Sequence, residues 1–321
     1  MKGLTDIPGI RVGHVSDYDA LTGCTVVLCE TGAAGGVDIR GAATGTEEID
    51  VLRPAHITDR VHGVVLAGGS AYGLEAASGV RRYLEHRGIG FSLGGPVVPI
   101  VPCAILYDLG IGKANVRPTR EMGEAAAAAA TTDAVKQGAV GAGTGATVGK
   151  ILGMAQAMKS GIGSATVSLS DTVKVAALVA VNALGDVRDP QTGKLVAGAR
   201  RAPNSMELAD TEAEIKRGAR GPSGRQNTTL AVVATNAKLS KVAASRLAEM
   251  ANLGMARTIF PVHTVFDGDL CFALSLGNET ADLTALGVAA AEAVAQAIVS
   301  AVKSAPSLGG VPGLAGPMGT R

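Results

Sequence analysis

The most restrictive feature of this 321-residue chain is a junction between a loop and an apolar segment in its last third. A loop rich in Pro and Gly (220–224) leads into Asn227-Thr228, and the apolar run Leu230–Ala234 follows at once. A run of that kind is typical of a buried strand. Cleavage before Thr228 would expose a threonine whose own α-amine could take the proton from its hydroxyl. Because the reference pKa of a free α-amine is about 7.7–8.0, part of it is an unprotonated base at neutral pH.

The same junction also has a plain structural interpretation. Asn-Thr-Thr is common where a loop enters a strand, because Asn and Thr side chains bond to nearby backbone groups. The tripeptide alone therefore does not separate a processing site from an ordinary turn.

Further segments favour the processing site, because six of them, in order, resemble the self-cleaving aminopeptidases of the DmpA/NylC type. That family includes the β-peptidyl aminopeptidases and the nylon-oligomer hydrolase. The resemblance runs from about Ile10 to Val302. The matching segments are Leu66–Ala76, Ile105–Asp108, Gly141–Lys150, Val181–Asn182, Asn227–Asn236 and His263–Asp269.

The resemblance implies a four-layer αββα sandwich of the DmpA/ornithine acetyltransferase type, with Thr228 opening a central strand. It implies one domain over residues 1–303, cut into a large fragment (1–227) and a small fragment (228–321). Residues 304–321 are rich in Gly and Pro, so we expect a flexible tail there. Relatives need no cofactor and form homo-oligomers, usually tetramers of processed heterodimers.

The resemblance also identifies the residues of the reaction. Thr228 would attack the carbonyl of Asn227, and the resulting ester would be hydrolysed. Lys150 matches a position near the nucleophile, where an ammonium would lower the pKa of the new α-amine and stabilise negative charge. Asn182 would donate its amide to an oxyanion. The remaining predicted catalytic residues are the two carboxylates of the Asp-Gly-Asp turn, Asp267 and Asp269.

Three residues are predicted to bind substrate. The phenol of Tyr107 could bond a substrate carbonyl, although a buried Tyr whose hydroxyl is merely satisfied fits equally well. Gly69 and Ser70 could offer backbone N–H groups at a helix start, where anions are favoured. Close packing of the backbone is the alternative interpretation of this turn.

Composition narrows the class of protein. The chain is 47% hydrophobic with only 2% aromatic residues, and its net charge is +1 from 29 basic and 28 acidic residues. Nucleic-acid binding is therefore not expected, because a basic surface and stacking aromatics are both lacking. The four cysteines and five histidines show no metal-binding spacing, so we expect no metal and reduced, buried thiols. Without a signal peptide or a membrane-spanning run, a cytoplasmic location is expected.

Periodicity and turn residues predict the main elements. A polar, Gly- and Pro-punctuated segment over 186–224 predicts a long exposed connection before the scissile bond. The expected helices are 71–87, 119–136, 240–254 and 284–303, and the expected strands are short ones within 10–30, then 63–67, 97–106, 166–182, 229–235 and 270–276.

The combined prediction is an autoprocessed amidohydrolase with an N-terminal threonine nucleophile. Its substrates would be short linear amides: peptides, β-peptides or 6-aminohexanoate oligomers. In peptidase relatives a Ser and a Glu can occupy the region of Asp267 and Asp269, and two aspartates resemble the nylon-oligomer hydrolase more closely. Two alternatives stay open: an acyltransferase of the ornithine acetyltransferase type, and a binding protein of the same fold without catalysis.

Overall fold

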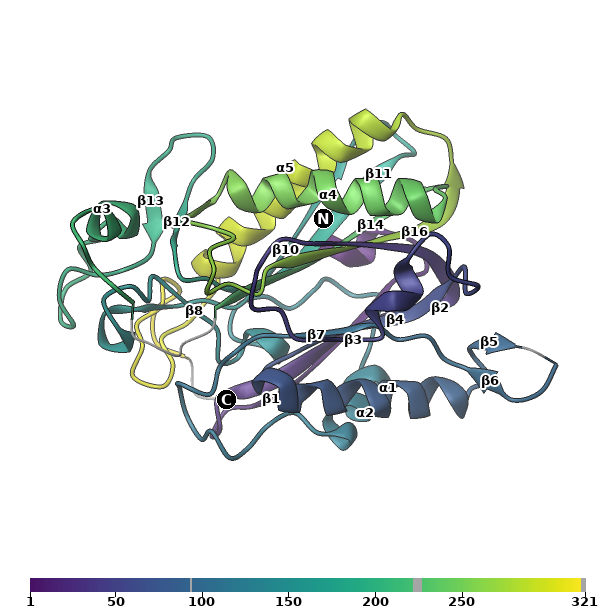
Figure 1. Cartoon of the computed structure of the whole chain (residues 1–321), viewed down its shortest axis with the longest axis horizontal. Coiled ribbons are helices and arrows are strands. Elements are labelled where there is room, and N and C mark those ends of the chain that lie inside the picture. Colours follow the sequence, from purple (N-terminus) through teal and green to yellow (C-terminus); the bar gives the residue numbers. More distant parts are fainter. Residues whose placement is uncertain (93, 222–226, 319–321) are drawn as a thin grey trace.

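Four layers make up the fold, and Figure 1 shows them in the order helices, strands, strands, helices. The computed structural model describes residues 1–92, 94–221 and 227–318. The helices α4 (Lys241–Ala256) and α5 (Leu283–Lys303) cover one side, and α1 (Ala76–Glu85) and α2 (Arg120–Ala128) cover the other. The predicted four-layer αββα sandwich is confirmed.

The two strand layers are joined by β2 (Thr22–Ile39), a long strand that passes from one to the other. Its first half pairs with β1 and β4, and its second half pairs with β16. Under α4 and α5 lie β10 (Ile162–Ser168), β11 (Lys174–Asn182), β14 (Thr228–Ala237) and β16 (Leu270–Glu279). The other layer holds β1 (Arg11–Asp17), β4 (Val61–Ala67), β7 (Cys103–Ile105) and β3 (Thr46–Glu47).

The strand β14 is buried on both faces, and its sequence explains why. Successive side chains of a strand point to opposite faces. Leu230 and Val232 enter the core between the two strand layers, whereas Ala231 and Val233 enter the core beneath α4 and α5. An uninterrupted apolar run is what a strand covered on both faces requires. Thr228 therefore begins a central strand, as predicted.

Two predicted helices are shorter than expected. The helix expected over 71–87 begins only at Ala76, because a 3-10 turn, η3 (Ser70–Glu75), precedes it. The helix expected over 119–136 ends at Ala128. The chain leaves that helix because Thr131 exchanges two backbone hydrogen bonds with Val12 of β1, at 2.9 and 3.1 Å.

The strand expected over 166–182 is a hairpin of β10 and β11, whose turn is closed by the Ser170 hydroxyl accepting from Val173 N at 3.0 Å. The predicted exposed connection (186–224) is also corrected for its described part, 186–221. It contains β12 (Asp186–Arg188), β13 (Leu195–Ala197) and α3 (Thr211–Lys216). The buried Asp186 carboxylate ties it together by accepting from Ala199 N and from the backbone and hydroxyl of Thr211.

The tail expected over 304–321 is packed wherever the structure describes it. Ala305 is buried, and its carbonyl accepts from Ala315 N at 3.0 Å. Pro312 O accepts from Lys159 N at 2.8 Å. The prediction of a flexible tail is thus wrong for 304–318, because backbone bonds fix it, while 319–321 lie outside the described residues.

The remaining elements are short. They are β5 (Phe91–Ser92), β6 (Val97–Val98), β8 (Thr147–Val148), β9 (Met158–Lys159), β15 (Ile259–Phe260), and the 3-10 turns η1 (Gly3–Asp6), η2 (Ile49–Leu52), η4 (Gly141–Gly143) and η5 (Met154–Gln156). The strand expected over 97–106 is divided between β6 and β7, with Pro99 and Pro102 in the interruption.

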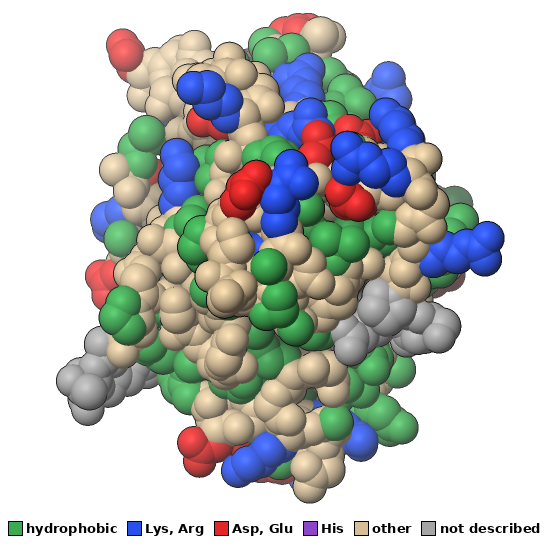
Figure 2. All heavy atoms as spheres, turned by 90° about the vertical axis from the view of Figure 1, so that its left-hand side faces the viewer, with side chains coloured by type: hydrophobic (Ala, Val, Ile, Leu, Met, Phe, Trp, Pro, Cys, Tyr) green, Lys and Arg blue, Asp and Glu red, His purple; other side chains and the backbone are tan. Residues whose placement is uncertain are grey.

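Surface charge is mixed on the face that carries α3, β12 and β13. Figure 2 shows basic and acidic side chains interspersed there. Several form ion pairs, such as Arg188 with Asp210 and Arg201 with Glu207. This face therefore does not present the single-sign field that nucleic-acid binding requires.

One helix in the described part of the chain, α5, has the length and hydropathy of a membrane span. Its most apolar 18-residue window is 72% buried inside the protein. Its burial against β10 and β11 explains that hydropathy, which is that of a core helix.

Candidate active site

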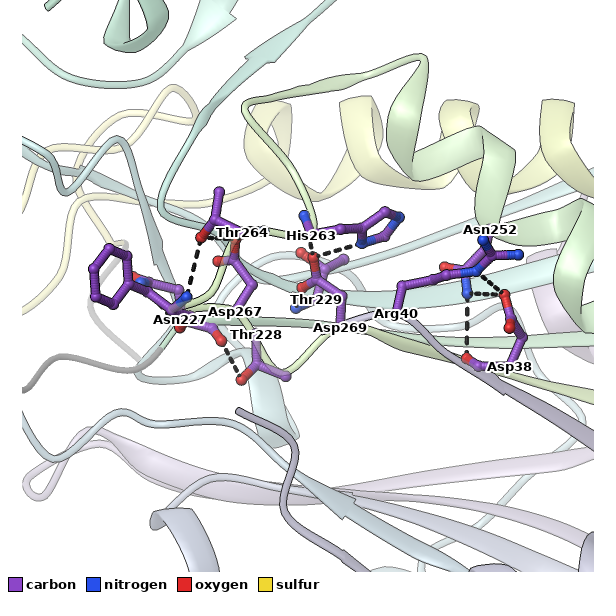
Figure 3. A network of polar contacts seen from close by, with 11 residues as sticks. Asp38, Arg40, Asn227, Thr228, Thr229, Asn252, His263, Thr264, Asp267 and Asp269 are labelled. Atoms are coloured by element: carbon purple, nitrogen blue, oxygen red, sulfur yellow. Dashed lines mark hydrogen bonds and ion pairs between the residues drawn. The ribbon is translucent and has the colours of Figure 1, made fainter. Parts of the chain in front are cut away.

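Thr228 lies against the carbonyl group that it would attack. Its hydroxyl donates to the carbonyl oxygen of Asn227 at 2.6 Å, and its side chain is 2% exposed (Figure 3). In the sheet Thr228 stands directly opposite Asn182, the last residue of β11. The scissile bond predicted from sequence therefore lies inside the sandwich.

The carbonyl oxygen of Asn227 has a second donor, the backbone N–H of Gly268, at 2.7 Å. On its other side, Asn227 N donates to Phe266 O at 2.9 Å, so the residue is held by the turn that precedes β16. A backbone N–H aimed at a carbonyl oxygen stabilises the negative charge that develops there during attack. Gly268 was not among the predicted site residues, because its contribution comes from the backbone.

Only glycine fits at position 268. A Cβ atom there would lie 2.7 Å from Ala43 O and 2.9 Å from the hydroxyl oxygen of Thr228. The glycine between the two aspartates thus lets the turn approach the nucleophile.

The ammonium of Lys150 is buried and anchored beside β11. Its Nζ donates to both oxygens of Asn182 at 2.8 Å and to Thr147 O at 3.1 Å. Its charge also lowers the pKa of Asp267, so the two groups interact electrostatically. Lys150 thus lies beside Asn182, the residue of β11 that pairs with Thr228.

Asn182 holds Lys150 and the adjacent loop. Besides Lys150 Nζ, its Oδ1 accepts from Thr147 N at 3.1 Å, and its Nδ2 donates to Tyr107 O at 2.9 Å. The expected donation from this amide to an oxyanion stays a prediction; what the structure describes is an amide that positions the lysine.

The two aspartates of the turn have different partners. Asp269 Oδ1 accepts from Thr229 N at 2.6 Å, and its Oδ2 accepts from His263 N at 3.1 Å and contacts His263 Nδ1 at 2.9 Å. Asp267 Oδ2 accepts from the backbone and hydroxyl of Thr264 at 2.8 and 2.6 Å. Both carboxylates are buried, and Figure 3 shows them beside Thr228 and Thr229.

The pKa of the Asp267 carboxyl is shifted from its usual range. Burial, and secondarily the charge of Asp269, raise the pKa of Asp267 to about 6, while the Thr264 hydrogen bonds and Lys150 act in the opposite direction. A carboxyl with a pKa close to the working pH is suited to proton transfer.

Tyr107 lines a small cavity together with Thr147 and Lys150. The volume of this cavity is about 20 Å³, enough for roughly one water molecule.

The backbone N–H groups of Gly69 and Ser70, which were predicted to bind substrate, already form hydrogen bonds within the protein. They donate to Asp108 Oδ1 at 2.7 Å and to Leu106 O at 3.0 Å. In this structure the two N–H groups hold residues 69–70 against Leu106 and Asp108. Their contacts with substrate stay a prediction.

A second buried lysine, Lys159, supports the loop behind the site and was not predicted. Its side chain is 0% exposed, and its Nζ donates to the carbonyls of Ala146 at 2.7 Å and Ser160 at 3.0 Å. Burial lowers the pKa of Lys159 to about 7, with Asp108 acting in the opposite direction. In the strand pair β8–β9, Lys159 is the partner of Thr147, which contacts Lys150 and Asn182.

The chain matches a known protein family over nearly its whole length. The sequence model of peptidase family S58 matches residues 2–315. The chain belongs to peptidase family S58. Membership confirms the resemblance seen in the sequence and makes the protein a hydrolase of amide bonds.

Relatives in the family include both peptidases and an oligomer hydrolase. An uncharacterized aminopeptidase of Mycobacterium bovis is 42% identical, over 97% of this chain and 96% of that protein. A 6-aminohexanoate-oligomer endohydrolase of a Kocuria species is 31% identical, over 93% of this chain and 85% of that protein.

Solved structures share the fold. A β-aminopeptidase of a Burkholderia species superposes with a TM-score of 0.69 and 25% identity, covering 98% of this chain and 90% of that one. The L-aminopeptidase D-Ala-esterase/amidase of Ochrobactrum anthropi, described as a variant of the Ntn hydrolase fold, gives a TM-score of 0.74 at 18% identity, covering 97% and 88%. The latter likeness concerns the fold alone.

Proposed function

We propose that this S58 hydrolase cleaves its own chain between Asn227 and Thr228 and then uses Thr228 as an N-terminal nucleophile. One observation carries the proposal. The Asn227 carbonyl oxygen accepts from both the Thr228 hydroxyl and the Gly268 N–H, at 2.6 and 2.7 Å. An ordinary loop-to-strand junction has no need for a nucleophile and a charge-stabilising donor on the same carbonyl.

Self-cleavage proceeds by an N-to-O acyl shift. The Thr228 oxygen bonds to the carbonyl carbon of Asn227, its proton is transferred to the amide nitrogen, and the carbon–nitrogen bond breaks. Water then hydrolyses the ester, which leaves a carboxyl group on Asn227 and restores the Thr228 hydroxyl beside a free α-amine.

The mature site repeats this acyl transfer on a substrate. The α-amine of Thr228 takes the proton of its own hydroxyl. The substrate carbonyl is attacked, its amine leaves with a proton, and water hydrolyses the acyl-enzyme. Lys150 supplies positive charge near the oxyanion and the α-amine. Asp267, with a pKa of about 6, provides a carboxylate for proton exchange at neutral pH.

The substrates proposed are short linear amides: N-terminal residues of peptides, β-peptides or 6-aminohexanoate oligomers. The names of the 42% and 31% identical relatives support aminopeptidase and oligomer-hydrolase activity, respectively. The Asp267-Gly268-Asp269 turn favours the oligomer side. We further propose that the protein is cytoplasmic and forms a tetramer of processed heterodimers. Light scattering of the purified protein would test the number of subunits.

Intact mass spectrometry of the wild type beside Thr228→Ala tests the proposal. The wild type should give two fragments, 1–227 and 228–321, and the variant should give one uncut chain. Release of amine from peptide amides, β-peptides and aminohexanoate oligomers would then rank the substrates. A wild-type chain that stays whole after prolonged incubation would overturn self-cleavage.

A further inference from the structure

Two adjacent residues outside the predicted catalytic set hold both carboxylates of the site. His263 directs its backbone N–H and its ring Nδ1 to Asp269 Oδ2, at 3.1 and 2.9 Å. Thr264 directs its backbone N–H and its hydroxyl to Asp267 Oδ2, at 2.8 and 2.6 Å. Figure 3 shows the pair lying over the two aspartates. Each residue thus uses one backbone and one side-chain group on one carboxylate.

The backbone at His263 is strained in a way that fits this task. Its φ is +55°, a left-handed conformation that only a few per cent of non-glycine residues adopt, with Asn, Asp and His over-represented among them. Such strain persists only where the surrounding structure holds it, and it gathers at functional sites. This conformation accompanies the convergence of His263 N and Nδ1 on one carboxylate oxygen.

The contacts continue from His263 to the nucleophile. Asp269 uses its other oxygen, Oδ1, to accept from Thr229 N at 2.6 Å, the shortest of its contacts. Thr229 follows Thr228 directly, so the position of the Asp269 carboxylate fixes the start of β14. The Asp269 side chain is 2% exposed, whereas the His263 side chain is 21% exposed. The imidazole therefore holds the carboxylate from its solvent side.

We infer that His263 and Thr264 form a positioning pair: His263 orients Asp269 and thereby the backbone at Thr228, and Thr264 orients Asp267. The inference rests on the proposed self-cleavage for its kinetic consequences, but the geometry of the pair stands apart from catalysis. Neither residue is a catalytic residue, because neither contacts the scissile carbonyl.

Position 263 permits a matched pair of variants. Both His263→Asn and His263→Gly tolerate a left-handed backbone, but only Asn has a side-chain N–H near the place of Nδ1. We expect His263→Asn to self-cleave within about threefold of the wild-type rate. His263→Gly should be about 10- to 100-fold slower, the effect of losing one hydrogen bond to a charged acceptor. Equal rates for the two variants, fast or slow, would overturn the role of the Nδ1 contact.

Position 264 permits a second pair. Thr264→Ser keeps the hydroxyl, and Thr264→Val replaces it with a methyl group of similar size. The Thr264 hydroxyl lowers the pKa of Asp267, on which Asp269 and Lys150 also act. The acid limb of the self-cleavage rate should therefore move to higher pH in Thr264→Val and stay in place in Thr264→Ser. An unchanged limb in Thr264→Val would overturn the role of Thr264.

A readout without catalysis separates this inference from the proposed function. In a Thr228→Ala background, hydrogen exchange of the Thr229 amide should be faster with His263→Gly than with His263→Asn, because Asp269 is no longer held. If the wild type fails to self-cleave yet this difference is present, the proposed function fails and the positioning pair stands. If the wild type cleaves and exchange is the same in both variants, the positioning pair fails.

Discussion

Gly268 donates its backbone N–H to the carbonyl oxygen of Asn227 across 2.7 Å, so the residue between the two aspartates polarises the bond proposed to be cut. The same oxygen accepts from the Thr228 hydroxyl at 2.6 Å. The proposed self-cleavage would therefore have both of these groups within the chain, one of them from the turn before β16.

Adding a methyl group at position 268 should slow self-cleavage strongly. In Gly268→Ala the new Cβ would meet the Thr228 hydroxyl oxygen at 2.9 Å and Ala43 O at 2.7 Å, so the turn or the nucleophile must move. Misplacement of about 1 Å costs on the order of 100-fold in rate. A time course of fragment appearance measures this. Gly95→Ala is the control, because its Cβ meets no atom within 4 Å; similar rates for the two variants would contradict the prediction.

Removing the buried charge beside Asn182 should impair self-cleavage more than folding. Lys150→Met has a side chain of similar length but lacks the ammonium group and its three hydrogen bonds. The rates of self-cleavage and of substrate hydrolysis should fall by about 10²–10³-fold, as on loss of a charge-stabilising donor. Stopped-time mass spectrometry gives the first rate and amine release the second. A folded Lys150→Met protein that processes at the wild-type rate would remove Lys150 from the mechanism.

The self-cleavage rate should depend on pH through Asp267. Burial raises the pKa of this carboxyl to about 6, so it is protonated below that pH and ionised above it. Since the proton-exchanging form is the carboxylate, the rate should rise with pH and level off above about 7. Asp267→Asn should be slow at every pH and lack this limb. If Asp267→Asn keeps an acid limb near pH 6, another group is responsible.

The strand after Thr228 could be predicted because its pattern is local, whereas the role proposed for Thr228 rests on the resemblance of segments along the whole chain. The apolar run after Thr228 predicts a strand buried on both faces, and β14 is such a strand. By contrast, Gly268 acts through its backbone, which no residue pattern marks as an oxyanion donor. The contact between His263 and Asp269 accompanies a left-handed backbone at His263, which histidine adopts more often than most residues but which its presence alone does not specify.

Long-range pairing explains the other differences. The Ala-rich stretch after Thr119 has high helix propensity, yet its helix ends at Ala128 because Thr131 pairs with Val12, far away in the sequence. Lys159 gives no sign of burial in the sequence, because lysine is mostly exposed. Its burial follows from carbonyl groups that the folded 143–146 loop brings together.

The free energy of unfolding should depend on pH because of Lys159. Burial lowers the pKa of this side chain to about 7 in the folded protein, whereas an unfolded lysine has a pKa of about 10.4. Between these values the unfolded chain binds one more proton, so the free energy of unfolding rises with pH. Below pH 7 the folded state carries the buried charge, and its cost is present in full.

Lys159→Met removes the titrating group. The quantity to measure is therefore the difference in free energy of unfolding between this variant and its parent. In a Thr228→Ala background both chains stay uncut, and urea unfolding gives each free energy. The stability of Lys159→Met relative to its parent should decrease by about 2 kcal/mol from pH 6.5 to 8.5, following about 1.4 kcal/mol per pH unit above the folded pKa. The buried thiols are common to both proteins and cancel. A difference that stays constant over this range would mean that Lys159 keeps its proton in the folded protein.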